Sequence, residues 1–485
     1  MTRTFSFASL AALGAVLFIS YPQLADPLIR YDDYPGFFGE PEIYYQKTLT
    51  EGRWLNYWWM LLETGWSSTV TFLLYQFAWA IFAAAAAANA LGPKARRLDL
   101  VVLTVLIAFS PQAFLISGWF NTLFAGMWLV AAFAVATLFL SASGARWLFL
   151  LVAPISMMSY STYPLLLFSL LLTRHDIRRS LGALVLLVGL LAISIVLGML
   201  LMYTINWYAH GVFDIVIADW RKPSPATDLA SLVNNLGELP KFADRLYYSI
   251  GYGHFTLSAL SVTMLIMALA VLAARRPAEA VYILAGICAT IGLMLVHSLK
   301  SGIQIPVRSL IVLWVYLAVA FVRAVQVYAR PERVRSIMAL FVLLAAVFGG
   351  QLQKHVRFSN AWQQETRDIV ARIPEGTKTL VFYGNVLAMD GAASAALFHH
   401  YALSLRMRQL TGLTVVNCGD PAVTCNYDPP FDDDDAREGE VLMEKVGDIL
   451  FALLPRMPED RKAWAELRLG AASGPAPRDT PEAGM

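Results

Sequence analysis

Long apolar stretches fill most of the first 350 residues of the chain. Because a helix needs about 20 apolar residues to cross the hydrocarbon core of a bilayer, the pattern predicts eleven membrane-spanning helices. They are residues 5–25, 66–91, 99–117, 121–141, 146–159, 160–173, 181–204, 253–274, 279–298, 309–325 and 336–350. The fifth and sixth are short and meet at Ser159–Tyr163, so they are either two helices that turn near the outer surface or one long broken helix.

Basic residues between the predicted spans indicate the orientation of the chain. Cytoplasmic loops carry an excess of Lys and Arg. If the amino terminus is cytoplasmic, nearly every basic cluster between spans falls on that side: Lys94, Arg96 and Arg97; Arg146; Arg174, Arg178 and Arg179; Arg275 and Arg276; and Arg323, Arg330, Arg333 and Arg335. Merging the fifth and sixth spans into one would move every later loop to the opposite side of the membrane and spoil this charge pattern. Eleven spans with an outer carboxyl terminus fit best, and the first span is expected to be a retained signal anchor rather than a cleaved signal peptide.

The composition agrees with an all-α polytopic membrane protein. Hydrophobic residues make up 58% of the chain and charged residues 15%, and the mean hydropathy is +0.56. Soluble domains carry about 25% charged residues. The chain has no basic patch with interleaved aromatic residues, so nucleic acid is not an expected partner.

The chain changes character after the last predicted span. Residues 351–470 are predicted to form a small extracytoplasmic α/β domain, and residues 471–485 a disordered tail, whereas residues 1–350 form the membrane domain. The elements expected in the α/β domain are a helix at 351–372, a strand at 379–383, a helix at 392–409 and a strand at 413–416.

The carboxy-terminal part has two further features, a cysteine pair and a histidine pair. Cys418 and Cys425 are close in sequence and can form a disulfide if this part lies outside the cytoplasm. They do not have the spacing of a zinc site. His399 and His400 fall within the predicted helix with no third ligand nearby, and we expect them at the surface.

An acidic pair follows the first span directly. Asp32 and Asp33 lie at the predicted membrane surface, where a carboxylate can take part in acid–base or cation chemistry. The alternative is a solvated turn, because Pro35 and Gly36 follow at once. The same loop continues with Gly52-Arg53-Trp54-Leu55.

Cations and aromatic residues also occur on the predicted outer side. Lys300 and Arg308 lie near the end of the ninth span, where they can bind a lipid phosphate or simply extend to the headgroups. The outer segments 26–65 and 205–252 are rich in Trp and Tyr. Such residues usually form an interfacial belt, but their rings also suit a saccharide acceptor.

This combination resembles the GT-C class of membrane glycosyltransferases, and within it the bacterial family of serotype-converting glucosyltransferases. The residues that carry the resemblance are Asp32-Asp33 after the first span and the element that begins at Gly52-Arg53. The turn Ser159–Tyr163 is similar to the family's external turn of small residues and Tyr, although the Gln that often follows the Tyr is replaced here. The similarity in span layout covers about the first 350 residues.

The resemblance implies that a sugar, glucose or another hexose, is transferred on the periplasmic face of the bacterial inner membrane. The donor would be a polyprenyl-phosphate sugar, and the acceptor a cell-surface glycan or glycolipid such as a lipopolysaccharide O-antigen. Asp32 and Asp33 would be the catalytic carboxylates. Single displacement by one base implies inversion at the anomeric carbon. Residues that would bind substrate or phosphate are Arg53, Lys300, Arg308, Tyr160 and Tyr163.

Two other functions stay open at the level of the sequence. A transporter or flippase of lipid-linked saccharides would be expected to carry ionisable residues within its spans, and often internal repeats; the spans contain almost no such residues. A polymerase or ligase would use the same kind of donor but transfer a chain. No organic cofactor and no metal ligand is expected, although a carboxylate pair leaves room for a divalent metal.

Overall fold

The computed structural model describes residues 2–459 except 178, 219–220, 222, 252–253, 304, 329–330, 396, 398, 421–422 and 433–434. The chain forms two compact units. The first, here called the helical unit, comprises Met1–Pro27, Pro35–Ala218 and Lys222–Gln353. The second, the carboxy-terminal unit, contains Leu28–Tyr34 together with the chain from Lys354 onward. The predicted tail, residues 471–485, lies outside the described residues.

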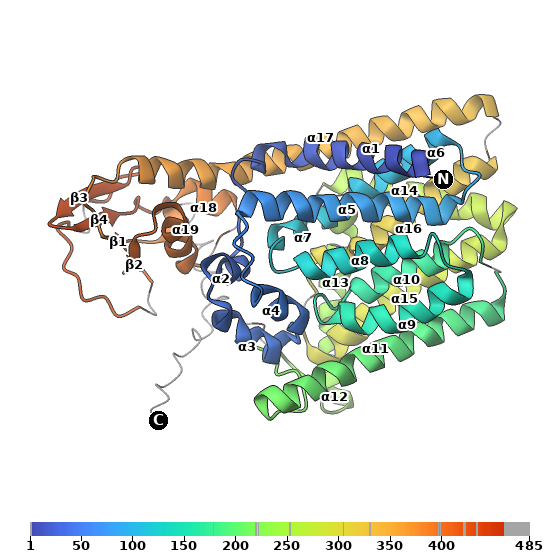
Figure 1. The fold of residues 1–485 in the computed structure, drawn as a ribbon, viewed down its shortest axis with the longest axis horizontal. Helices are drawn as coiled ribbons and strands as arrows, with labels where there is room; N and C mark the ends of the chain where they lie inside the picture. The colour runs from blue at the N-terminus through green and yellow to red at the C-terminus, as the bar shows by residue number, and fades with distance from the viewer. Residues whose placement is uncertain are drawn as a thin grey trace. The chain divides into compact units, whose positions relative to one another are not determined.

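The helical unit is built from helices that run side by side (Figure 1). The first half of the chain forms α1 (Thr2–Ser20), α2 (Tyr34–Phe38), α3 (Pro41–Glu51), α4 (Trp54–Met60), α5 (Ser68–Leu91), α6 (Arg97–Ala108), α7 (Pro111–Ile116), α8 (Phe124–Ala136), α9 (Ala142–Met157), α10 (Tyr163–Thr173) and α11 (Leu181–His210). The helices that follow are α12 (Leu229–Asn235), α13 (Leu239–Ile250), α14 (Phe255–Arg275), α15 (Pro277–Ser301), α16 (Ile311–Tyr328) and α17 (Pro331–Ala371).

The described helices indicate a multi-pass membrane protein. Six are long and apolar enough to cross a membrane: Phe5–Gln23, Ser68–Leu91, Leu181–His210, Phe255–Arg275, Pro277–Ser301 and Val307–Tyr328. A bent pair makes a seventh if it is counted as one span, and three shorter apolar helices are α8, α9 and α10. The predicted all-α membrane class is therefore confirmed in its coarse form.

The third predicted span is not a straight helix. The helices Arg97–Ala108 and Pro111–Trp119 meet at an angle of 47°. Pro111 has no N–H to continue the hydrogen-bond ladder, and its ring clashes with the preceding turn. Ser110 caps the new helix by accepting a hydrogen bond of 3.2 Å from the Ala113 N–H.

The fifth and sixth predicted spans are two separate helices. α9 ends at Met157, and α10 begins at Tyr163 with Pro164 in its first turn. Proline suits this position because its missing N–H would have no partner inside the helix. The two helices pack against each other, so the residues between them form a turn at one end of the helical unit.

Small residues allow the central helices to approach closely. α5 packs against α1, α6 and α8, and its run Ala83–Ala87 is buried. In membrane proteins, alanine at such contacts lets helix backbones come together and gain van der Waals contact. α10 is buried along its whole length, and it therefore lies inside the bundle.

The carboxy-terminal unit contains a four-stranded sheet with the order β2-β1-β4-β3. The strands are β1 (Thr379–Tyr383), β2 (Thr414–Asn417), β3 (Leu442–Val446) and β4 (Ile449–Leu453). β1 pairs in parallel with β2 and β4, and β3 pairs antiparallel with β4. The short helices of this unit are α18 (Asp390–Ser394) and α19 (Tyr401–Thr411). Its hydrophobic core joins the sheet to Trp362 of α17 and to Leu28 from the amino-terminal part of the chain.

The α/β character predicted for this part is confirmed, but the predicted helix at 392–409 is wrong. The chain forms α18 and α19, and the described residues between them are not helical. His399 and His400 fall in that connection, and His400 is buried rather than at the surface. The Asn417 side chain donates a hydrogen bond of 3.0 Å to the His400 carbonyl, which fixes the connection to the end of β2.

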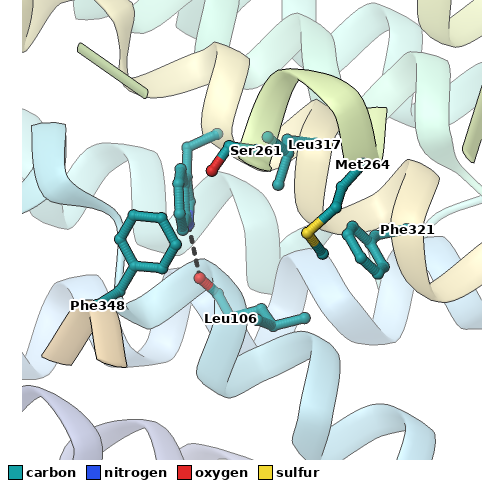
Figure 2. Close-up of a pocket in the computed structure, with 7 residues that line it drawn as sticks. Leu106, Ser261, Met264, Leu317, Phe321 and Phe348 are labelled. Atoms are coloured by element: carbon teal, nitrogen blue, oxygen red, sulfur yellow. Dashed lines mark hydrogen bonds between the residues drawn. The ribbon is translucent and has the colours of Figure 1, made fainter. Parts of the chain in front are cut away.

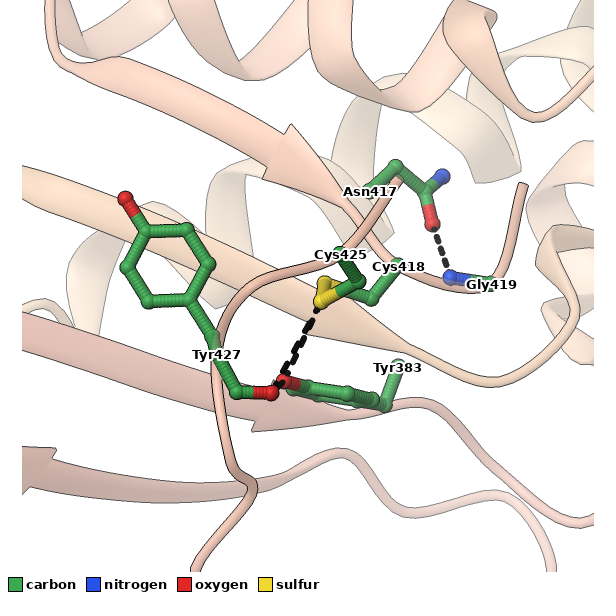
Figure 3. The surroundings of a disulfide bond; sticks show 6 residues. All are labelled: Tyr383, Asn417, Cys418, Gly419, Cys425 and Tyr427. Atoms are coloured by element: carbon green, nitrogen blue, oxygen red, sulfur yellow. Dashed lines mark hydrogen bonds between the residues drawn. A yellow bond between two sulfur atoms is a disulfide. The ribbon is translucent and has the colours of Figure 1, made fainter. Parts of the chain in front are cut away.

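The two cysteines that follow β2 are joined in a disulfide (Figure 3). Tyr383, at the end of β1, donates a hydrogen bond of 2.6 Å to the Tyr427 carbonyl just after Cys425. Asn417 accepts a hydrogen bond of 3.1 Å from the Gly419 N–H at the start of the disulfide loop. The disulfide predicted for Cys418 and Cys425 is therefore present, and hydrogen bonds from both neighbouring strands hold its loop.

Candidate functional site

Arg53 is positioned by a sharp change of chain direction. α3 ends at Gly52, which has φ +68° and whose N–H donates to the Thr48 carbonyl at 3.0 Å. A glycine suits this left-handed conformation because it has no Cβ. The next residue, Arg53, precedes α4 and is half-buried. Its Nε lies 3.1 Å from the Glu51 carboxylate.

Arg53 also holds the turn between α9 and α10. Its Nη1 donates a hydrogen bond to the Ser159 carbonyl, and its guanidinium lies 4.9 Å from the centre of the Tyr160 ring. Asn56 donates to the same Ser159 carbonyl at 3.1 Å. A cation over an aromatic face is favourable by about 0.5–2 kcal/mol. Arg53 is therefore a positioning residue for this turn, and its charge is paired with Glu51.

Tyr160 connects this turn to the segment before α16. Its hydroxyl lies 2.9 Å from the Ser309 hydroxyl. The neighbouring residue, Arg308, lies half-buried in the 3₁₀ turn Val307–Leu310, and its guanidinium is 4.2 Å from the centre of the Trp119 ring. We call Arg53, Tyr160, Ser309, Arg308 and Trp119 the arginine–aromatic cluster. It brings together four segments that are far apart in the sequence.

No carboxylate among the described residues compensates the charge of Arg308. In the described part of the chain, its side chain has the contact with Trp119 but no ion pair. A half-buried cation without a counterion is costly, because it has lost part of its hydration. Stacking on an indole ring relieves some of that cost and leaves the planar edge of the guanidinium able to donate hydrogen bonds. This residue is therefore the best described candidate for binding an anion.

The other predicted phosphate-binding residues are placed differently. Tyr163 is completely buried at the start of α10, with its ring 5.5 Å from the ring of Tyr160. Lys300 lies in the last turn of α15 with an exposed side chain, and its carbonyl accepts a hydrogen bond of 2.8 Å from Ala226. Tyr163 supports Tyr160 by packing, and among the described contacts none joins the Lys300 side chain to the cluster.

Asp32 and Asp33 belong to the carboxy-terminal unit. They lie in a 3₁₀ turn, Tyr31–Asp33, in which Asp33 is buried and Asp32 is half-buried. The preceding Tyr31 makes edge-to-face ring contacts with His399 and Tyr401, each at 5.5 Å. The rings of His399 and Tyr401 stack on each other at 4.9 Å. The segment with the acidic pair is thus held by the α/β fold, although it follows the first span in sequence.

Some aromatic residues of the segment 35–65 pack inside the helical unit. Trp54 is buried and donates a hydrogen bond of 2.7 Å to the Asn206 side chain near the end of α11. Tyr45 packs against Trp54 and against His210. Trp58, in contrast, is exposed. Tyr45 and Trp54 therefore stabilise the contact between α3, α4 and α11.

The apolar pocket in the helical unit is not a substrate site. It lies between α6, α14, α16 and α17 (Figure 2) and has a volume of about 10 Å³. Trp314 in its wall donates a hydrogen bond of 2.6 Å to the Leu106 carbonyl. A cavity needs about 10–15 Å³ to hold one water molecule, so this one is a packing gap. Among the described residues, no group of three or more His, Cys, Asp or Glu side chains could hold a metal ion.

Sequence reasoning missed three partners that define these sites. Trp119 and Ser309 complete the arginine–aromatic cluster, and Tyr401 completes the ring contacts of Tyr31. Its place at the end of an apolar run could have drawn attention to Trp119. Nothing local in the sequence points to Ser309 or Tyr401, because their roles depend on contacts with distant segments.

We expect Gly52→Ala to destabilise the helical unit more than Gly211→Ala. Both glycines have φ near +70°, but a Cβ at Gly52 would lie 2.6 Å from the Met202 sulfur, whereas a Cβ at Gly211 would meet nothing within 4 Å. Both variants lose about 1–2 kcal/mol to the left-handed backbone, and Gly52→Ala adds the clash. Thermal unfolding of the purified protein measures the difference. Equal shifts in Tm would show that the Met202 contact carries no cost.

Comparisons with known proteins do not place the chain in a family: no protein-family model matches it, and no curated protein is similar enough to count as a relative.

Proposed function

We propose that this protein is an inverting glycosyltransferase that moves a hexose from a polyprenyl-phosphate donor to a glycan or glycolipid outside the cytoplasmic membrane. The observation that carries this proposal is the half-buried Arg308 of the arginine–aromatic cluster, which stacks on Trp119 and has no counterion among the described residues. The phosphate of a lipid donor would supply the missing negative charge. In the transfer itself, the bond between the anomeric carbon and the phosphate oxygen breaks, and positive charge stabilises the departing polyprenyl phosphate.

The cluster lies where a lipid phosphate would be expected. Arg308 lies in the turn before α16, at the start of the segment Val307–Tyr328, which is long and apolar enough to cross a membrane. Lys300 lies in the last turn of another such helix, α15. Both cations therefore lie at the ends of apolar segments, where the proposed topology would put the lipid headgroups. Arg53 keeps the Tyr160 turn in place, and Lys300 would add long-range attraction for the donor.

The acceptor needs a base, and the resemblance assigns this role to Asp32. The acceptor hydroxyl attacks the anomeric carbon as its proton passes to the carboxylate, so the configuration inverts. Asp33, which is buried, would support Asp32. This assignment rests on the sequence pattern. It is supported by the finding that the turn carrying both residues has a defined set of aromatic contacts rather than being a bare solvated loop.

We propose the eleven-span topology, with the amino terminus in the cytoplasm and the carboxy-terminal unit in the periplasm. α8, α9 and α10 are short for a bilayer about 30 Å thick. α10 is wholly buried and α8 and α9 pack beside it, so neighbouring helices can shield their ends from lipid. The Cys418–Cys425 disulfide supports a location outside the cytoplasm, because disulfides persist in oxidising compartments.

A carboxy-terminal alkaline phosphatase fusion should be active, and a fusion to green fluorescent protein at the same position should be dark. Both results follow from a periplasmic carboxyl terminus. Fusions after Arg276 serve as controls, and they should show the opposite pattern because that loop is predicted to be cytoplasmic. A fluorescent carboxy-terminal fusion with no phosphatase activity would refute the eleven-span topology.

The function itself is tested by transfer of a labelled sugar from a synthetic polyprenyl-phosphate donor in detergent. No membrane separates two compartments under these conditions, so a flippase would cause no chemical change.

A further inference from the structure

Glu279 is a buried carboxylate surrounded by three arginines. Arg323 donates to both of its oxygens, from Nε at 2.6 Å and from Nη2 at 3.2 Å. Arg179 and Arg276 lie further away, at 3.7 Å and 3.9 Å from the carboxylate oxygens. We call these four residues the Glu279 cluster. The short bidentate pair with Arg323 neutralises Glu279, and the charges of the other two arginines are only weakly balanced.

Neighbouring acidic residues do not remove this excess of positive charge. Asp99 is linked to Arg323 through Gln326, with hydrogen bonds of 3.0 Å and 2.7 Å. Asp176 is held by Arg174 at 2.7 Å and 2.8 Å. Asp99 is therefore connected to Arg323, and the charge of Asp176 is already paired with Arg174. Among the described carboxylates, Arg179 and Arg276 therefore share Glu279, which is already bound at shorter distances by Arg323.

Arg179 and Arg276 have hydrogen-bonding capacity that the other residues of the Glu279 cluster do not use. The Arg276 side chain is 54% exposed. The Arg179 Nε is buried and has no hydrogen-bond acceptor among the described residues, although its Nη2 donates to the Arg174 carbonyl at 3.1 Å. Burial lowers the pKa of Arg179, and Glu279 opposes this effect only in part. An additional anion would satisfy both guanidinium groups.

The cluster lies at the end of the helical unit opposite the arginine–aromatic cluster. Arg179 lies just before the start of α11, and Arg276 just before the start of α15. Near the other ends of the same two helices lie Asn206, which accepts a hydrogen bond from Trp54, and Lys300. The starts of α11 and α15 are tied together because Tyr282 donates a hydrogen bond of 2.8 Å to the Ser180 carbonyl.

Exposed apolar side chains continue directly from the cluster. Leu181 and Val185 on α11, and Val281 and Leu284 on α15, are among the exposed large hydrophobic residues. A strongly basic group at the boundary between polar loops and an exposed apolar helix surface has the character of a phospholipid headgroup site. The phosphate requires cations, and the acyl chains require the apolar surface.

We propose that Arg179 and Arg276 bind the phosphate of an anionic phospholipid whose acyl chains lie on the exposed faces of α11 and α15. An anionic lipid fits better than a zwitterionic one, because two incompletely balanced guanidinium groups favour a ligand with net negative charge. With the proposed topology, the site faces the cytoplasmic leaflet. Its existence does not depend on the sugar-transfer reaction.

Native mass spectrometry of the full-length protein in detergent tests this proposal. Phosphatidylglycerol and phosphatidylcholine with the same acyl chains are added separately, and the retained lipid adducts are counted. We expect phosphatidylglycerol to be retained preferentially. We also expect Arg276→Gln to weaken its binding about fivefold, since one arginine near an anionic surface contributes about 1 kcal/mol. Arg179→Gln should do the same, and it provides a second variant if the first folds poorly.

Arg96→Gln is the matched control, because Arg96 is exposed before α6 and its side chain makes no capping hydrogen bond. This variant should retain phosphatidylglycerol as the unsubstituted protein does. Equal retention of the two lipids would overturn the proposal, as would an equal loss in Arg96→Gln and Arg276→Gln. Displacement of the lipid by millimolar inorganic phosphate would also overturn it, because the site would then recognise free phosphate without need of the apolar surface.

Discussion

Replacing Asp32 by Asn is expected to lower sugar transfer by about 10²–10⁴-fold, the usual contribution of a general base. The amide keeps the size of the side chain but cannot accept the proton of the acceptor hydroxyl. The protein should still insert and fold, because Asp32 is only half-buried and the contacts of Tyr31 with His399 and Tyr401 are unchanged. Initial rates of transfer at saturating donor measure the effect.

Two further variants make this prediction specific. Asp26→Asn removes a carboxylate from the same part of the chain and should leave transfer nearly unchanged. Asp33→Asn should lower both activity and stability, because Asp33 is fully buried and a buried polar group is costly to alter. Near-normal transfer by both Asp32→Asn and Asp33→Asn would end the catalytic assignment and restore the solvated-turn interpretation.

Replacing Arg308 by Ala is expected to reduce use of the donor about ten- to a hundredfold, since a hydrogen bond to a charged group contributes about 1.5–3 kcal/mol. The loss should appear in kcat/KM for the donor and leave the KM for the acceptor unchanged. Arg308→Lys keeps the charge but loses the planar stacking on Trp119 and should show an intermediate loss.

Lys300→Ala provides the comparison for Arg308→Ala. Lys300 is exposed, so solvent and salt screen its charge and its removal should have a small effect. If Lys300→Ala and Arg308→Ala are equally mild, the arginine–aromatic cluster does not bind the donor phosphate. In that case the cluster serves only to join the segments around Tyr160 and Trp119.

The sequence predicted most helices because membrane helices are defined by local apolar runs. The runs around Ser68–Leu91, Leu181–His210 and Pro277–Ser301 are helices close to their expected positions. The bend after Ala108 was missed, although Ser110-Pro111 is a local signal for a new helix start. The hairpin of β3 and β4 was also missed, even though Gly447-Asp448 separates two apolar runs in the manner of a tight turn.

The candidate site was predictable only in part. The sequence marked Arg53, Tyr160 and Arg308 as residues of interest, and the structure joins them through Tyr160 and Ser309. The sequence could not show that Trp119 stacks on Arg308, because the two residues are far apart in the sequence. Nor could it show that Tyr31 packs on His399 and Tyr401, since this contact depends on the folding of a distant α/β unit.

The most direct test of the proposed function is sugar transfer by the purified protein in detergent. The protein is mixed with a synthetic polyprenyl-phosphate hexose, labelled in the sugar, and with a glycolipid fraction from the bacterial envelope. The account predicts labelled glycolipid of inverted anomeric configuration and an equal amount of released polyprenyl phosphate. If several donor sugars and acceptors yield no product, while vesicles containing the protein move the intact lipid between leaflets, the protein is a transporter and the glycosyltransferase proposal is wrong.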